Sequence, residues 1–83
     1  MPEILENIEK IHTTELGVQR IKKNICRPAE ETEVELISFC KLLIEAPDCN
    51  IEKRGKNWYC RKDNIELTVN SYNFCIITAK IKE

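Results

Sequence analysis

The side chains best suited to binding an anion lie in two basic segments of the sequence, residues 20–27 and 53–62, which contain no acid. Lysine and arginine bind phosphate through charge-assisted hydrogen bonds, so the two segments would form an anion-binding surface if the fold brought them together. The alternative is that they are ordinary solvated cations on a helix and a hairpin. The candidate nucleic-acid-binding residues are Arg20, Lys23, Arg27, Lys53, Arg54, Lys56, Tyr59 and Arg61.

His12 is the side chain whose ordinary pKa suits proton transfer near neutral pH. Metal-free cleavage of RNA needs a base for the 2′-hydroxyl, an acid for the leaving oxygen and cations for the charge of the transition state. The candidate catalytic residues are therefore His12, Lys56 and Arg61. The competing interpretation is that His12 satisfies hydrogen bonds at a junction between two helices.

Trp58 and Tyr59 are adjacent, so on a strand they point to opposite faces of the sheet. The exposed aromatic ring would stack on a nucleic-acid base between Lys56 and Arg61. The alternative is that both rings pack against helices or against a partner, since aromatic residues with arginine are also typical of protein–protein hot spots.

The remaining chemistry argues against an ordinary metabolic enzyme. There is no glycine-rich phosphate loop and no nucleophile elbow. The cysteines at positions 26, 40, 49, 60 and 75 are odd in number and widely spaced, whereas zinc sites usually show paired ligands at short spacing. We therefore expect reduced thiols, no metal and no cofactor.

Charge is distributed unevenly along this chain of net charge −1. Residues 1–48 contain 6 Lys/Arg and 10 Asp/Glu, whereas residues 49–83 contain 7 and 4. A length of 83 residues with 42% hydrophobic residues predicts one globular domain, residues 1–83, and its small core favours a homodimer. The sequence has no secretory signal and no apolar run of about 18 residues, which predicts a cytoplasmic protein without membrane contacts.

Three helices are expected in the first half of the chain. Apolar residues recur with a helical period, and Thr13 or Thr14 is a suitable N-cap for the second helix. Thr32 and Glu35 form a capping box at the start of the third. The helices are predicted over about residues 3–12, 14–25 and 32–46.

Antiparallel strands fill the second half of the chain. Residues 65–70 alternate strictly between apolar and polar side chains, which indicates a strand with one buried face, and turn formers flank it. The order predicts an α+β fold, with two to three N-terminal helices packed on one face of a three- to four-stranded antiparallel meander. The strands are predicted over about residues 50–54, 57–61, 65–70 and 74–81.

Two stretches, HTTELGVQRIKKNI (12–25) and GKNWY…ITA (55–79), resemble a family of small bacterial proteins of unknown function. Its members share a Thr-Glu-Leu-Gly helix start, an Arg-Ile-x-x-Asn-Leu helix, a Gly-Lys-Asn-Trp/Tyr-Tyr strand, and final Thr-Val/Ile-Asn and Ile-Ile-Thr-Ala strands. The resemblance covers the chain except the helix between Pro28 and Pro47. It implies no activity, because none is established for the family.

A second pattern is similar to the barnase–colicin–RelE group of small, toxin-like ribonuclease folds. In that group, N-terminal helices precede an antiparallel meander whose last strand often reads Val-Val-Thr-Ala, and Ile76-Ile77-Thr78-Ala79 stands at the corresponding place here. Many of its members cut RNA with a few Lys, Arg, His, Thr or Tyr side chains and no metal. The resemblance implies the same chemistry for this chain.

These observations lead to two hypotheses of different classes. In the first, a small cytosolic protein of a bacterium or mobile element binds nucleic acid, RNA in particular, through a basic aromatic surface, and cuts it as a metal-free RelE/barnase-like ribonuclease if the catalytic candidates converge. In the second, the chain is a non-enzymatic protein–protein interaction module or inhibitor acting as a compact dimer. A basic aromatic cleft would favour the first, and a flat apolar patch or an exposed strand edge the second.

Overall fold

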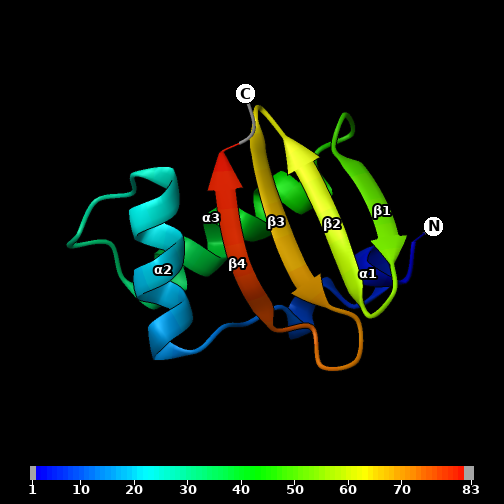
Figure 1. The fold of residues 1–83 in the computed structure, drawn as a ribbon, viewed down its shortest axis with the longest axis horizontal. Coiled ribbons are helices and arrows are strands. Elements are labelled where there is room, and N and C mark those ends of the chain that lie inside the picture. Colours follow the sequence, from blue (N-terminus) through cyan, green and yellow to red (C-terminus); the bar gives the residue numbers. More distant parts are fainter. Residues whose placement is uncertain (1, 82–83) are drawn as a thin grey trace.

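The structure, a computed structural model, describes residues 2–81, in which short helices precede an antiparallel sheet (Figure 1). This arrangement confirms the predicted α+β fold. The elements in order are α1 (Glu3–Glu6), the 3-10 turn η1 (Ile8–Lys10), α2 (Glu15–Ile25), α3 (Glu33–Glu45), β1 (Asn50–Arg54), β2 (Asn57–Lys62), β3 (Ile65–Asn70) and β4 (Ile76–Ile81).

The four strands form a simple meander in the order β1-β2-β3-β4, with every neighbouring pair antiparallel. Asp63 and Asn64 connect β2 to β3 with φ angles of 51° and 66°, the left-handed pair that a tight hairpin turn requires. Lys62 pairs with Ile65 directly across this turn, so the turn sets the register of the central hairpin.

Helix α3 lies behind the sheet in Figure 1, and α2 lies beside β4 at the edge of the sheet. The face turned towards α3 forms the core together with the buried residues of that helix, Leu36, Cys40, Leu43 and Ile44. On the sheet, the core side chains are Trp58, Cys60, Leu67, Val69, Ile76 and Ala79. The opposite face of the sheet has no helix over it in this view.

The first predicted helix, residues 3–12, is wrong in its length. Helix α1 ends after one turn because Asn7 leaves helical geometry, and its side-chain amide donates to the Glu3 carbonyl at 2.9 Å. His12 is extended, since its N–H donates to the Phe74 carbonyl and its carbonyl accepts from the Ile76 N–H. A residue that pairs with a strand in this way cannot also continue a helix.

The last strand starts at Ile76 and not at Phe74 as predicted. The side chain of Asn70 organises the preceding turn by accepting from the N–H groups of Tyr72 and Asn73. Phe74 then adopts a left-handed φ of 58°, which turns its ring into the core. The chain therefore resumes extended geometry only after this residue.

The Thr-Thr-Glu-Leu-Gly segment holds the start of α2 against β4. Thr14 is the N-cap and accepts from the Gly17 N–H at 3.0 Å, while the Thr13 hydroxyl donates to the Ile76 carbonyl at 2.9 Å. Gly17 is buried directly beneath Thr13, and a Cβ atom there would lie 2.0 Å from the Thr13 Oγ1. Glycine is needed at this position because of packing.

Replacing Gly17 with alanine is expected to lower the free energy of unfolding by about 1–3 kcal/mol, the usual cost of overpacking a filled site. At a helix position with free space around the Cβ atom, the same change would raise the free energy of unfolding by about 1 kcal/mol. Urea denaturation of the variant and of a Gln19→Ala control, changed at an exposed position of the same helix, measures the difference. A Gly17→Ala protein more stable than wild type would contradict this packing argument.

Burial raises the pKa of the Cys40 and Cys60 thiols to about 12, whereas Cys26 is exposed. Because the thiolate is the reactive form, we expect an alkylating reagent at pH 8 to modify Cys26 in the folded protein and to reach Cys40 and Cys60 only after unfolding. Mass spectrometry of peptides labelled with and without urea measures this order. Equal labelling of Cys60 and Cys26 without urea would contradict it.

Candidate functional site

The sheet face turned away from α3 (Figure 1) is here called the open face. The strand register places the polar members of each strand on it. Alternation places every second side chain of a strand on this face. Its residues, assigned from the strand register, are Asn50, Glu52, Arg54, Asn57, Tyr59, Arg61, Glu66, Thr68, Asn70, Thr78 and Lys80.

A pocket of about 270 Å³ opens on this face over β1, β2 and β3. We call it the open-face pocket. Its lining is almost entirely polar and combines two guanidinium groups, two carboxylates, an amide and a phenol. The lining residues are Asn50, Glu52, Arg54, Tyr59, Arg61 and Glu66.

Arg54 and Tyr59 form the aromatic wall of the open-face pocket. The Arg54 guanidinium lies 4.1 Å from the centroid of the Tyr59 ring, a stacked cation–π contact, and its Nε is 3.5 Å from the Glu52 carboxylate. Tyr59 is half-buried, whereas its neighbour Trp58 points into the core on the other face. Of the two aromatic residues, Tyr59 is the one available to a ligand.

Glu66 is the most enclosed charged side chain of the pocket, with 8% of its surface exposed. It lies between Arg61, its partner on β2, and Lys80, its partner on β4. The Lys80 Nζ is 3.6 Å from its carboxylate, and within residues 2–81 no group makes a hydrogen bond to that carboxylate. The Glu66 carboxylate therefore keeps acceptor capacity for hydrogen bonds from solvent or from a ligand.

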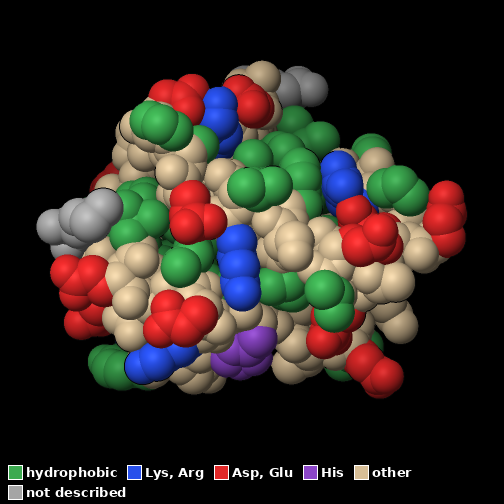
Figure 2. All heavy atoms as spheres, turned by 180° about the vertical axis from the view of Figure 1, so that it is seen from behind, with side chains coloured by type: hydrophobic (Ala, Val, Ile, Leu, Met, Phe, Trp, Pro, Cys, Tyr) green, Lys and Arg blue, Asp and Glu red, His purple; other side chains and the backbone are tan. Residues whose placement is uncertain are grey.

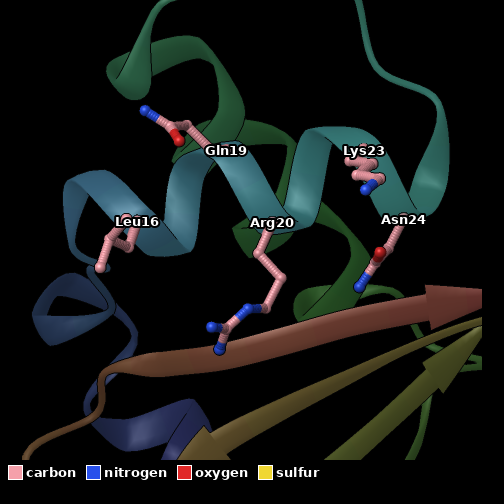
Figure 3. Close-up of a pocket in the computed structure, with 5 residues that line it drawn as sticks. All are labelled: Leu16, Gln19, Arg20, Lys23 and Asn24. Atoms are coloured by element: carbon pink, nitrogen blue, oxygen red, sulfur yellow. The ribbon is translucent and has the colours of Figure 1, made fainter.

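Helix α2 borders the open face along β4 with a second, shallow groove of about 490 Å³, lined by Leu16, Gln19, Arg20, Lys23 and Asn24 (Figure 3). The side chains of Arg20 and Asn24 extend towards β4. The Asn24 amide donates to the Ala79 carbonyl at 3.0 Å and to the Thr78 hydroxyl at 3.4 Å. Because Thr78 belongs to the open face, these bonds place Arg20 beside that face.

The structure thus brings part of each predicted basic segment to one side of the molecule. Arg20 and Lys23 lie along α2 at the β4 border, and Arg54 and Arg61 lie on β1 and β2.

Arg27 and Lys53 lie away from the open face, and each contacts an aromatic ring of the fold. The Arg27 guanidinium lies 3.9 Å from the centroid of the Phe39 ring and pairs with Glu31. Hydrogen bonding within this pair raises the pKa of Arg27 and lowers that of Glu31. Lys53 lies 5.8 Å from the ring of Trp58 and, being its partner in register, points to the core side of β1.

The three catalytic candidates do not come together. His12 lines a pocket with α3 residues including Glu33 and Lys41, on the helical side seen in Figure 2, and its Nδ1 is 2.8 Å from the Lys10 carbonyl. Lys56 lies in the β1–β2 turn, where its carbonyl accepts from the Ser71 N–H. Arg61 is on the open face.

Sequence reasoning missed the pocket residues Asn50, Glu52 and Glu66, as well as Asn24 and Lys80. The alternation of residues 65–70 predicts that Glu66 lies on the polar face of the strand. It does not predict that neighbouring side chains bury Glu66. The bond from Asn24 to β4 depends on the packing of two elements that are distant in the sequence.

No group of three or more His, Cys, Asp or Glu side chains within residues 2–81 is arranged to hold a metal ion. The described helices are all too short or too polar to cross a membrane.

Comparison with family models matches residues 5–80 to the family described as "Protein of unknown function (DUF3781)". The match covers nearly the whole chain, so the chain belongs to this family, and the predicted membership of an uncharacterised family is confirmed. Neither the curated proteins nor the solved structures gave a match.

The Arg27–Glu31 pair predicts a dependence of stability on pH. The pKa of Glu31 is lowered from its ordinary value of 4.5 in the folded state, so the stability gained from the pair is present above that value and is lost as pH falls below it. Replacing Glu31 with glutamine should flatten the loss of stability between pH 5 and pH 3, relative to wild type and to a Glu30→Gln control. Thermal unfolding across this range measures the slopes, and equal slopes for all three proteins would contradict the assignment.

Proposed function

Because the family to which this chain belongs has no assigned activity, we propose from the geometry that the open face binds single-stranded RNA. The observation that carries this proposal is that Arg54, Tyr59, Arg61 and Lys80 share one polar sheet face, with Arg20 at its α2 border.

These residues supply the two components that single-stranded nucleic-acid sites combine. Cations follow the phosphate backbone, and an aromatic ring stacks on bases without demanding a given sequence. From β1 to β4 the sheet measures about 14 Å, three strand spacings, so one RNA strand can reach all four strands. A strand of RNA crossing the sheet would meet Arg54 and Arg61 first and Arg20 at the far border.

The shape of the site favours a single strand over a duplex. The open face is the surface of a sheet, and α2, the only long helix beside it, lies along its edge and is not positioned to enter a groove (Figure 1). The bases of single-stranded RNA are free to turn towards aromatic and arginine side chains, which is how sheet surfaces recognise them. The opposite, helical face has acidic side chains spread across it, which would repel phosphates (Figure 2).

The position of His12 favours binding over cleavage. Proton transfer near neutral pH is best performed by histidine, and this one lies on the helical side with α3, whereas Arg61 and Tyr59 are on the open face. We therefore propose that the protein holds RNA without cutting it.

Fluorescence anisotropy with a labelled, unstructured RNA tests the proposal. Tyr59→Ala is expected to weaken binding by about tenfold or more, because stacking on one aromatic ring contributes roughly 1–3 kcal/mol, while Tyr59→Phe keeps the ring and the affinity. Arg61→Ala should reduce the slope of log K against log salt by about 0.7, the value for one phosphate contact on a single strand.

Lys41→Ala is the matched control, because this lysine lies with His12 on the helical face and should leave binding unchanged. The RNA should also stay intact on a gel, for wild type and for His12→Ala alike. Cleavage that disappears in His12→Ala would replace the binding proposal with a ribonuclease. The complete absence of RNA binding would overturn the proposal and favour a protein partner.

A further inference from the structure

We infer that the open-face pocket is a subsite for a guanine base, and that the Glu66 carboxylate is the group that recognises it. This inference rests on the proposed binding of single-stranded RNA and adds a base preference to it. It starts from the spare acceptor capacity of an enclosed carboxylate.

Burying a charged group is costly unless hydrogen bonds replace those to water, and enclosed carboxylates in proteins are normally well supplied with donors. Glu66 has 8% of its side chain exposed, yet its one close partner in the described part of the chain is Lys80, at 3.6 Å. The Glu66 carboxylate therefore lines a polar pocket and has acceptor capacity left for a ligand. A ligand that brings two adjacent N–H donors would satisfy both of its oxygens.

Guanine is the base that presents this pattern. Its Watson–Crick edge carries the N1–H and N2–H donors side by side, and one carboxylate accepts from both. Adenine and cytosine each place a ring-nitrogen acceptor beside their amino group, and uracil places its single N–H between two carbonyl oxygens. Each of these three would direct an acceptor at Glu66, an unfavourable contact in an enclosed site.

The neighbours of Glu66 complete the complementarity. Arg61 is its directly paired residue on β2 and lines the same pocket, where it supplies the phosphate contact beside the base. The stacked Arg54–Tyr59 pair, 4.1 Å apart, offers a flat wall of the kind on which RNA bases stack. The pocket volume of about 270 Å³ is sufficient for a bicyclic base.

Glu52 provides an internal comparison within the same pocket. Its side chain is 62% exposed, and its carboxylate is already paired with Arg54 at 3.5 Å. It has the same charge as Glu66 but can turn to solvent.

The test uses short oligouridines with one central position occupied by guanosine, adenosine, cytidine or uridine, and measures their affinities by anisotropy. Wild type should bind the guanosine oligomer more tightly by roughly 5- to 150-fold, the discrimination expected of one good bidentate contact. Glu66→Gln should abolish this preference, because an amide offers one acceptor and one donor where guanine brings two donors. Glu33→Gln, which removes a carboxylate on the helical side beside His12, should retain it.

Each outcome decides a different point. Equal affinity of wild type for all four oligomers would overturn the guanine subsite and leave RNA binding standing. A preference that persists in Glu66→Gln, with urea denaturation showing that this variant folds, would overturn the role of Glu66. No binding of any oligomer would overturn the proposed function itself.

Discussion

The outer edge of β4 depends on hydrogen bonds from a segment more than 50 residues earlier in the chain. Edge strands leave unpaired backbone groups, which proteins must cover or discourage from pairing. Here the Thr13 hydroxyl donates to the Ile76 carbonyl, the Asn24 amide donates to the Ala79 carbonyl, and the backbone of His12 pairs with Phe74 and Ile76. Because the partners come from both ends of α2, they set where the helix lies and which of its faces meets the sheet.

The same bonds give the two sheet faces different surroundings. With α2 held at the edge, α3 lies behind the sheet (Figure 1) and shares the core with Ile4, Ile11 and Ile21 of the N-terminal half, while the polar side chains of β2 and β3 stay on the other face. Glu66 is enclosed there by its strand neighbours and not by a helix, so its carboxylate remains reachable from the open-face pocket. The position of α2 thus places cations along one border of the open face and leaves the middle of this face uncovered by a helix.

Local patterns predicted the elements that depend on local physics. The alternation of residues 65–70 and the capping box of Thr32 and Glu35 predicted β3 and the start of α3, because both act within a few residues. The first helix and the start of β4 were predicted wrongly because the backbones of His12 and Phe74 hydrogen-bond to each other, although these residues are far apart in the sequence. The approach of Arg20 to the open face could not be read from the sequence, since it requires the Asn24–Ala79 bond.

Charge separation, and not net charge, determines what this surface can bind. The chain carries a net charge of −1, but its acids concentrate in the helical half and its cations in the strands. At physiological salt the Debye length is about 8 Å, shorter than the 21 Å extent of the molecule along its shortest axis, so acids on the far face are screened from a ligand on the open face. The ligand therefore responds mainly to groups it touches. In the proposed RNA complex, the cations would draw in any polyanion, whereas Tyr59 and Glu66 would distinguish one kind from another, because stacking and paired hydrogen bonds require a base of the right shape.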